Sequence, residues 1–274
     1  MLESFLVVLE DHAEALIPYA VSAAKALNAH PTVAWPRRDA SGLEDGSIEA
    51  RLEAVAGAGP ALKVRAHEGL QAFAAAAREA GIEAEILEPE VGQDPPRDIV
   101  PRFARAFDFT MVQQRKAGRA PGRDDYTAAL LSESGRPVWV VPAIQRQSAQ
   151  FKRVLVAWDG GAAAAHAFSE AKPIFVQAAQ VDIVTITSAH TPRSVAQGGE
   201  RLAARLQRAN IAARFHTLPS EDDPASALLS YAADANSDVM VCGGYSHSPL
   251  RETLFGGATR NLLTSMTLPI LFAR

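Results

Sequence analysis

The chain has 274 residues, of which 48% are hydrophobic and 21% charged, which is typical of a globular protein with one large domain or two ordinary ones. Its net charge of −4 argues against nucleic acid as a partner, because proteins that bind nucleic acid neutralise phosphates with clustered cations. No apolar run approaches the roughly 18 residues of a membrane-spanning helix. The acidic start of the chain is unlike a signal peptide, so we expect a cytoplasmic protein with no membrane partner. Cys242 is the one cysteine, which excludes an internal disulfide and a cysteine-rich metal site.

In the first half of the chain, short apolar runs alternate with stretches of helical periodicity. The apolar runs predict strands at residues 4–9, 31–35, 82–87, 109–112 and 137–141. The periodic stretches predict helices at residues 12–27, 47–55, 67–80, 94–107 and 127–133. Residues 113–125 are expected to form a loop.

A polar connector follows at residues 142–150, and then the alternation begins again. Strands are predicted at residues 153–158, 181–187, 211–217, 239–242 and 269–273. Helices are predicted at residues 164–175, 194–207, 224–235 and 258–265. Pro173 falls inside the first of these helices, where the missing N–H should disturb it.

The two halves align as internal repeats, which is a signal of duplicated structural units. Three landmarks recur in the same order: residues 6–10 over 155–159, residues 108–112 over 238–242, and a Leu-Leu pair six residues before a proline at 130–137 and 262–269. Alternating strands and helices favour a parallel sheet in each half, covered on both faces by right-handed crossovers.

Glycines cluster at one strand end and one helix start in the second half. The strand predicted at residues 239–242 ends at Gly243 and Gly244, and Gly256 and Gly257 precede the helix at 258–265. Glycine lets the backbone approach an anion closely, and a helix start offers free N–H groups and a positive dipole end. These features are typical of a nucleotide-phosphate site in an α/β sheet.

The spacing of these residues resembles the glycine signature of universal stress proteins: Gly, two residues, Gly, nine residues, Gly, then Ser or Thr. Gly243 and Gly256 match the first and third glycine, while Ser246 replaces the second glycine and Gly257 replaces the closing hydroxyl residue. Two of the four positions therefore depart from the pattern of the ATP-binding branch.

The resemblance extends over the whole chain and implies an α/β fold of two tandem Rossmann-like (adenine nucleotide alpha hydrolase-like) domains, at residues 1–144 and 150–274. Each would be a five-stranded parallel sheet of order 3-2-1-4-5 flanked by helices. The two would pack as an intramolecular pseudo-dimer, and a homodimer of whole chains is compatible with this arrangement. We expect residues 137–141 and 269–273 at the interface between two separate sheets, so one continuous sheet would contradict the expectation.

The resemblance also implies a ligand, ATP or another adenine nucleotide, in the crevice where strand order reverses. Asp159 would face the ribose beside Gly160, the base would lie near Thr185 to Thr187, and Thr259 would add a hydroxyl near the phosphates. The phosphates would lie over Gly243, Ser246, Gly256 and Gly257. Purely structural interpretations stay open: Asp159 can cap the following helix, and the glycines can serve tight turns or close packing.

The first half is predicted to have lost this site. Gln113 and Gln114 stand in place of the strand-end glycines, and Asp124 and Asp125 lie near the helix start, where they would repel an anion. Substitutions at Gln113 or Gln114 are therefore expected to leave nucleotide binding unchanged.

A non-catalytic stress-response protein with a regulatory or protective role is the function that the resemblance favours. A slow nucleotide hydrolase, a nucleotidyl-transfer enzyme and a ligand-free interaction scaffold are the alternatives. An enzyme should bring a general base or metal-binding carboxylates to the phosphate loop, and Asp159 is the one acidic residue so placed. Ser246 and His247 follow a strand as in a nucleophile elbow, but the final glycine is replaced by Ser248. The scattered histidines indicate no metal site.

Overall fold

In a computed structural model, residues 3–10, 13, 15–36, 48–87, 96–115, 126–220, 223–244 and 257–274 are described. The first half contains β1 (Ser4–Val8), α1 (Leu16–Leu27), β2 (His30–Ala34), α2 (Ile48–Glu79), β3 (Glu85–Leu87), α3 (Pro96–Ala104), β4 (Phe109–Gln113), α4 (Tyr126–Glu133) and β5 (Val138–Val141). The second half contains β6 (Arg153–Ala157), α5 (Ala162–Glu170), α6 (Lys172–Phe175), β7 (Gln180–Thr187), α7 (Arg193–Arg208), β8 (Ala213–Pro219), α8 (Pro224–Asp234), β9 (Val239–Gly243), α9 (Gly257–Ser265) and β10 (Ile270–Ala273).

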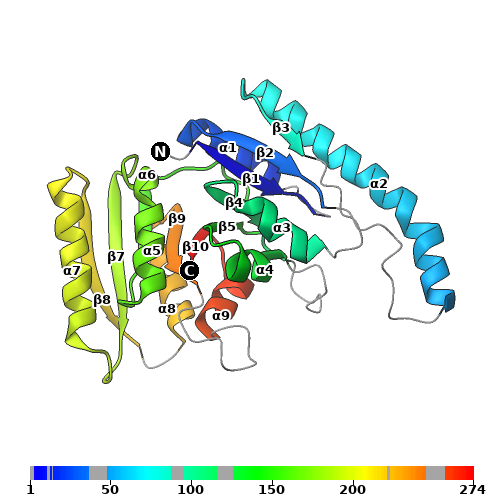
Figure 1. The fold of residues 1–274 in the computed structure, drawn as a ribbon. Coiled ribbons are helices and arrows are strands. Elements are labelled where there is room, and N and C mark those ends of the chain that lie inside the picture. The colour runs from blue at the N-terminus through cyan, green and yellow to red at the C-terminus, as the bar shows by residue number, and fades with distance from the viewer. Residues whose placement is uncertain are drawn as a thin grey trace.

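The strands form one sheet in the order β3-β2-β1-β4-β5-β10-β9-β6-β7-β8 (Figure 1). Numbered within its own half, each set of five strands has the order 3-2-1-4-5, as predicted. Within each half the strands pair in parallel, while β10 pairs antiparallel with β5, placing Leu271 opposite Trp139. The last strands therefore do meet, but the expectation of two separate sheets was wrong.

This pairing removes two unpaired sheet edges at once, because each half leaves its last strand with free backbone N–H and C=O groups. Antiparallel pairing satisfies those groups directly and makes one continuous sheet of the two halves. The division into domains at residues 144 and 150 stays a prediction.

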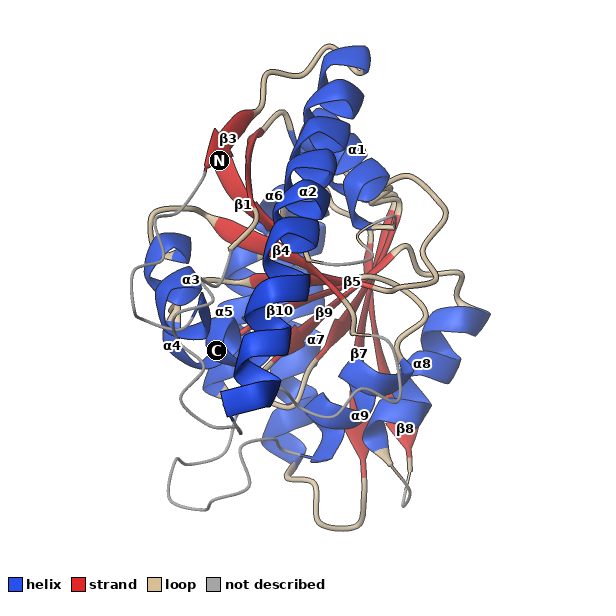
Figure 2. Ribbon diagram, turned by 90° about the vertical axis from the view of Figure 1, so that its right-hand side faces the viewer, coloured by secondary structure: helices blue, strands red, loops and turns tan. Residues whose placement is uncertain are grey.

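Helices cover both faces of the sheet (Figure 2). One buried cluster lies between the sheet and α1, α2, α5, α6 and α7, and a second lies between the sheet and α3, α4, α8 and α9. Side chains alternate between these two clusters along each strand, as the period of two in a β-strand requires: Leu155 joins the second cluster and Val156 the first. In Figure 1, α7 and β8 lie at one end of the molecule and α2 at the other.

The internal repeat is visible in two aspartates that begin corresponding strands. The carboxylate of Asp108 accepts the N–H of Ser4 at 3.1 Å, and that of Asp238 accepts the N–H of Arg153 at 2.7 Å. In each half, this aspartate joins the start of the fourth strand to the start of the first. The landmark aspartates of the sequence thus have the same structural role in both halves.

The connector between the halves is packed against the first half. The N–H of Ala149 donates to Ser22 Oγ at 2.8 Å, and the ring of Phe151 lies 5.6 Å from that of Trp139. Trp139 itself is fully buried. The connector therefore has a defined path between β5 and β6.

Two helix predictions need correction. The helices predicted at 47–55 and 67–80 are parts of one helix, α2 (Ile48–Glu79), which runs through Gly57, Gly59 and Pro60. These residues disfavour a helix, but packing of the later part of α2 against the sheet, through Leu70 and Phe73, outweighs local propensity. The helix predicted at 164–175 is divided into α5 and α6, because Pro173 cannot continue the α5 ladder and begins α6 instead.

The described residues include no helix that is both long and apolar enough to cross a membrane.

Candidate functional site

Asp159 and Gly160 lie in the tight turn between β6 and α5. Asp159 Oδ1 accepts the N–H of Gly161 at 2.7 Å, so the exposed carboxylate stabilises its own turn, close to the capping role left open by the sequence. Gly160 has a φ of 78°, and a β-carbon there would lie 3.2 Å from Val195. Glycine is therefore required at position 160 both for backbone conformation and for contact with α7.

Thr185 is not brought to the site. Its side chain is 1% exposed, and its hydroxyl donates to the carbonyl of Trp158 at 2.8 Å. The Trp158 indole N–H donates to the carbonyl of Val195, holding the turn against α7. The expected base contact through Thr185 lies inside the molecule, because the side chains of a strand alternate between its two faces.

The next strand residue, Ile186, lies on the face covered by α8 and α9. Ile186, Ala157 and Cys242 pack partly buried against that second cluster. By strand alternation Asp159 follows Ala157 on the same side. Sequence reasoning missed Ala157 and Ile186, although the period-two pattern of β6 and β7 was sufficient to assign their face.

Gly243 lets β9 lie directly on the first turn of α5. A β-carbon on Gly243 would lie 2.6 Å from the backbone nitrogen of Ala164 and 2.9 Å from the carbonyl carbon of Ala163. The structural interpretation of this glycine, close backbone approach, is therefore confirmed. At Gly244 the nearest atom, Leu131 Cδ2, would be 3.7 Å from a β-carbon, which is ordinary contact.

After Gly244, the structure next describes Gly257, the first residue of α9 and the last position of the glycine signature. Gly257 is exposed, and among the described atoms none lies within 4 Å of a β-carbon built on it. Thr259 is 8% exposed, so its side chain faces the protein more than solvent. Ser246 and Gly256, two of the predicted phosphate contacts, lie outside the described residues, as do Asp124 and Asp125.

The α8 helix start is linked to α9 through Asp223. The Asp223 carboxylate accepts the N–H groups of Ala225 and Ser226 and so caps α8. Burial alone would raise the pKa of Asp223, but a hydrogen bond from Asn261 of α9 and those from the α8 start lower it below its ordinary value. Asp223 thus links the start of α8 to the middle of α9.

Burial, and to a smaller extent the negative charge of Asp159, raise the pKa of the Cys242 thiol to about 12. The thiol therefore stays protonated at neutral pH, as expected for an inert core cysteine. The effect of Asp159 also shows that Cys242 and Asp159 share one neighbourhood at the ends of β9 and β6.

The first half differs at the positions equivalent to Gly243 and Gly244. Gln113 Oε1 accepts the N–H of Leu16, the first residue of α1, at 3.2 Å. Gln114 extends into the second half, where its Nε2 donates to the carbonyl of Leu263 at 2.9 Å. The glutamines therefore do more than replace glycines: one side chain lies at the start of a helix and the other contacts α9.

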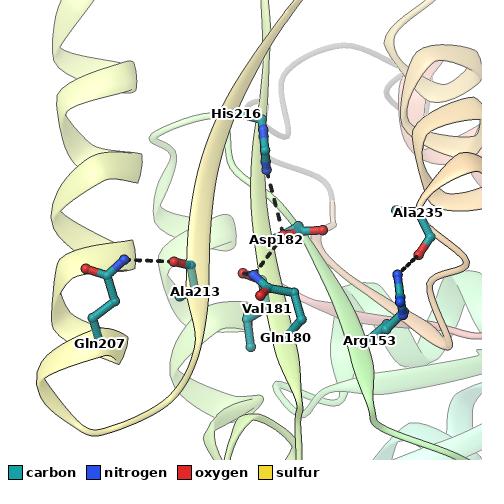
Figure 3. A network of polar contacts seen from close by, with 8 residues as sticks. All are labelled: Arg153, Gln180, Val181, Asp182, Gln207, Ala213, His216 and Ala235. Carbon is teal, nitrogen blue, oxygen red and sulfur yellow. Dashed lines mark hydrogen bonds and ion pairs between the residues drawn. The ribbon is translucent and has the colours of Figure 1, made fainter.

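A polar network lies on the outer part of the second half, between β7, β8 and α8 (Figure 3). Asp182 Oδ1 accepts Gln180 Nε2 at 3.0 Å and lies 3.7 Å from His216 Nε2. Burial and the charge of Asp182, together with a hydrogen bond to it, raise the pKa of Tyr231 to about 12, while Arg214 opposes the shift. At the sheet edge Gln207 Nε2 donates to the carbonyl of Ala213.

Within the described part of the chain, no cluster of three or more His, Cys, Asp or Glu side chains is arranged to hold a metal ion.

Two α/β units of one topology, joined last strand to last strand, define a tandem protein of the Rossmann-like type. Residues 150–274, the second half of the chain, match the model of the Universal stress protein family. A search of curated proteins gave no match.

Solved structures give the same fold for the whole chain. A universal stress protein from Archaeoglobus fulgidus DSM 4304 matches with a TM-score of 0.73 at 17% identity, over 99% of this chain and 98% of that one. A functionally unknown protein from Pseudomonas aeruginosa PAO1 matches with a TM-score of 0.57 at 19% identity, over 99% and 92%. A protein from Pseudomonas aeruginosa UCBPP-PA14, provisionally assigned to the universal stress proteins, gives 0.59 at 18%, over 99% and 93%. The whole chain therefore has the same fold as these structures.

Proposed function

We propose that the second half binds one adenine nucleotide, ATP or another, and that the first half binds none. In this proposal the chain is a regulatory or protective stress-response protein in the cytoplasm and has no catalytic activity. The observation that carries the proposal is the difference between Gly243 and Gln113 at corresponding strand ends. Gly243 carries no side chain, whereas the Gln113 carboxamide lies at the start of α1, where its oxygen accepts the N–H of Leu16 beside the carbonyl of Ala13 and takes the place that an anion would need.

The start of α5 supports an accessible site in the second half. Gly161 caps this helix without a side-chain hydrogen bond in the described structure. Helix starts with free N–H groups attract anions through those groups and through the helix dipole. At α9, Gly257 has no side chain, and none of the described atoms lies within 4 Å of a β-carbon built on it, which suits close approach of a phosphate.

Asp159 supports a sugar contact. Its carboxylate is exposed, Oδ1 accepts the N–H of Gly161, and Oδ2 has no partner among the described residues, so it is a candidate acceptor. Ribose hydroxyls are suitable donors for such an oxygen. Ala157 and Ile186, on the same side of the sheet, offer an apolar surface to a base.

The departures from the glycine signature predict weak binding rather than none. Gly257 has no hydroxyl, and losing one neutral hydrogen bond costs about 0.5–1.5 kcal/mol, roughly two- to tenfold in affinity. We therefore expect an affinity below that of relatives with the complete signature.

The proposal is tested by denaturing the purified protein after incubation with ATP and removal of free ligand, and identifying what is released by mass spectrometry. One equivalent of adenine nucleotide per chain is expected from the wild type. None is expected from Gly256→Asp, because the new carboxylate would lie beside the phosphates. Equal release from both proteins would contradict the proposed site, and no release from the wild type would favour a ligand-free scaffold.

A further inference from the structure

The first half contacts the candidate nucleotide site of the second half through two side chains. Gln114, immediately after β4, contacts the last turn of α9, and Leu131 of α4 lies near Gly244, just after β9, where a β-carbon built on the glycine would be 3.7 Å from Leu131 Cδ2. Both contacts cross the β5–β10 junction between the halves. The first half, which is proposed to bind no nucleotide, thus lies against both α9 and the end of β9, the two elements beside the candidate phosphate site.

The Gln114 carboxamide has a partner for each of its polar atoms. Nε2 donates to the carbonyls of Leu263 at 2.9 Å and Thr264 at 3.2 Å, while Oε1 accepts the N–H of Ala143 at 3.2 Å. The reverse orientation of the amide would place oxygen against two carbonyls, so these partners fix one orientation. The side chain joins the end of α9 to the turn that follows β5.

The end of α9 benefits from such a donor. The last carbonyls of a helix have no partner within it, and α9 has no basic residue in its last turn. A donor at Leu263 and Thr264 satisfies two of these groups and fixes where the helix ends. Because a helix of nine residues moves as a rigid rod, fixing its end also fixes its first turn, which begins at Gly257.

We propose that Gln114 is a positioning residue for the nucleotide site of the second half, holding α9 so that its first turn meets the phosphates. This inference rests on the proposed function for its effect on ligand affinity, but the effect on α9 itself does not depend on a ligand. It also revises the expectation from sequence that substitutions at Gln114 leave binding unchanged. The first half then contributes a side chain to the nucleotide site without binding nucleotide itself.

A matched control is available in a contact that runs in the other direction, from a side chain of the second half to a helix end of the first. Arg274, at the end of β10, donates to the carbonyl of Ser132 at 3.4 Å, near the end of α4 in the first half. Arg274→Ala therefore removes a cross-half contact to a helix end while leaving α9 untouched. Gln114→Glu supplies a second variant of nearly the same shape that has no donor for the α9 carbonyls.

The experiment measures hydrogen exchange across residues 257–265, together with ATP affinity by calorimetry, in the wild type, Gln114→Ala, Gln114→Glu and Arg274→Ala. We expect both Gln114 variants to exchange several-fold faster in α9 and to bind ATP about three- to tenfold more weakly. Arg274→Ala should match the wild type in both.

The outcomes separate the inference from the proposed function. Faster α9 exchange with unchanged ATP affinity would overturn the positioning role, as would unchanged exchange in α9. Absence of ATP binding by the wild type, with faster α9 exchange in the Gln114 variants, would overturn the proposed function and leave Gln114 as the residue that positions α9.

Discussion

The two halves share one strand order but differ where β4 and β9 end. After β4, the Gln113 side chain accepts a hydrogen bond from the start of α1, whereas after β9, Gly243 lets the backbone of β9 touch the start of α5. In the first half, the Gln113 side chain thus lies at the switch point of the sheet. In the second half, no side chain follows from Gly243, and the polar turn at Asp159 is exposed. Under the proposed function, the two halves keep one fold while only the second keeps a ligand site.

Placing the glutamine of the first half at the corresponding position of the second, Gly243→Gln, should produce the largest effect. Gly243→Gln would place a β-carbon 2.6 Å from the Ala164 nitrogen. Relieving this overlap would require the backbone of β9 or of α5 to move. We expect a loss of about 3 kcal/mol or more in the free energy of unfolding, together with loss of nucleotide binding. Urea denaturation measures the first quantity and calorimetry the second.

Gly244→Ala is the control for that exchange, because its β-carbon would meet its nearest neighbour at 3.7 Å and should be tolerated. If Gly243→Gln unfolds at the same urea concentration as Gly244→Ala, the close approach of β9 and α5 is not what requires glycine.

A smaller effect is expected from Gln113→Ala in the first half. The change removes one of the two acceptors of the Leu16 N–H, which also donates to the carbonyl of Ala13 at 3.0 Å, so the cost is that of one ordinary hydrogen bond, about 0.5–1.5 kcal/mol. The free energy of unfolding should fall by that amount while ATP affinity stays the same. Gln113→Glu keeps an acceptor at a helix start and should restore stability, so equal loss in both variants would contradict the capping role.

The outer edge of the second half provides a test at alkaline pH. The pKa of Tyr231 is raised to about 12, above its ordinary value of 10.0, so the protonated form is favoured in the folded state. The resulting stability is fully present below pH 10 and is lost as the pH rises towards 12. Denaturation midpoints should fall across this interval, and Tyr231→Phe should flatten the decline. An equally steep decline in Tyr231→Phe would show that other groups cause it.

The smallest expected effect concerns Cys242, whose counterpart in the first half is Val112. Because burial and the charge of Asp159 raise the thiol pKa to about 12, reaction with a thiol reagent at neutral pH should be far slower than for free cysteine. Burial is the larger cause, so Asp159→Asn should accelerate the reaction by less than about threefold. Asp182→Asn, a change within the polar network of β7 and β8, should leave the rate unchanged, and an equal acceleration there would contradict the assignment to Asp159.

The elements and their order within each half were predictable, because hydrophobic periodicity is a local property that tertiary packing reinforces. The repeated aspartates at 108 and 238 and the Leu-Leu-Pro landmarks were sufficient to recognise the duplication. The junction between the halves was predicted in location but not in form. Edge-to-edge pairing of β5 with β10 depends on backbone groups that every strand possesses, so the side-chain pattern does not reveal it.

For the candidate site, Asp159, Gly160 and Gly243 lie at the carboxyl end of the sheet as predicted, but Thr185 points into the opposite core. Counting alternate residues from Asp182 would have placed Ile186, not Thr185, on the side of α9. The contact from Gln114 to α9 was beyond sequence reasoning, since it joins residues 149 positions apart. Roles for Ser246, Gly256 and the base contacts stay predictions.

The most direct test of the difference between the halves is calorimetric titration with ATP of the wild type, Gly257→Asp and Gly257→Asn. Gly257 begins α9 and has no described atom within 4 Å of a β-carbon built on it, so we expect either side chain to fit, and aspartate at a helix start should preserve or raise stability. The account predicts one nucleotide per wild-type chain, similar affinity in Gly257→Asn, and a loss of about tenfold or more in Gly257→Asp, whose charge opposes the phosphates. Two nucleotides per chain, or equal affinity in Gly257→Asp and Gly257→Asn, would contradict it.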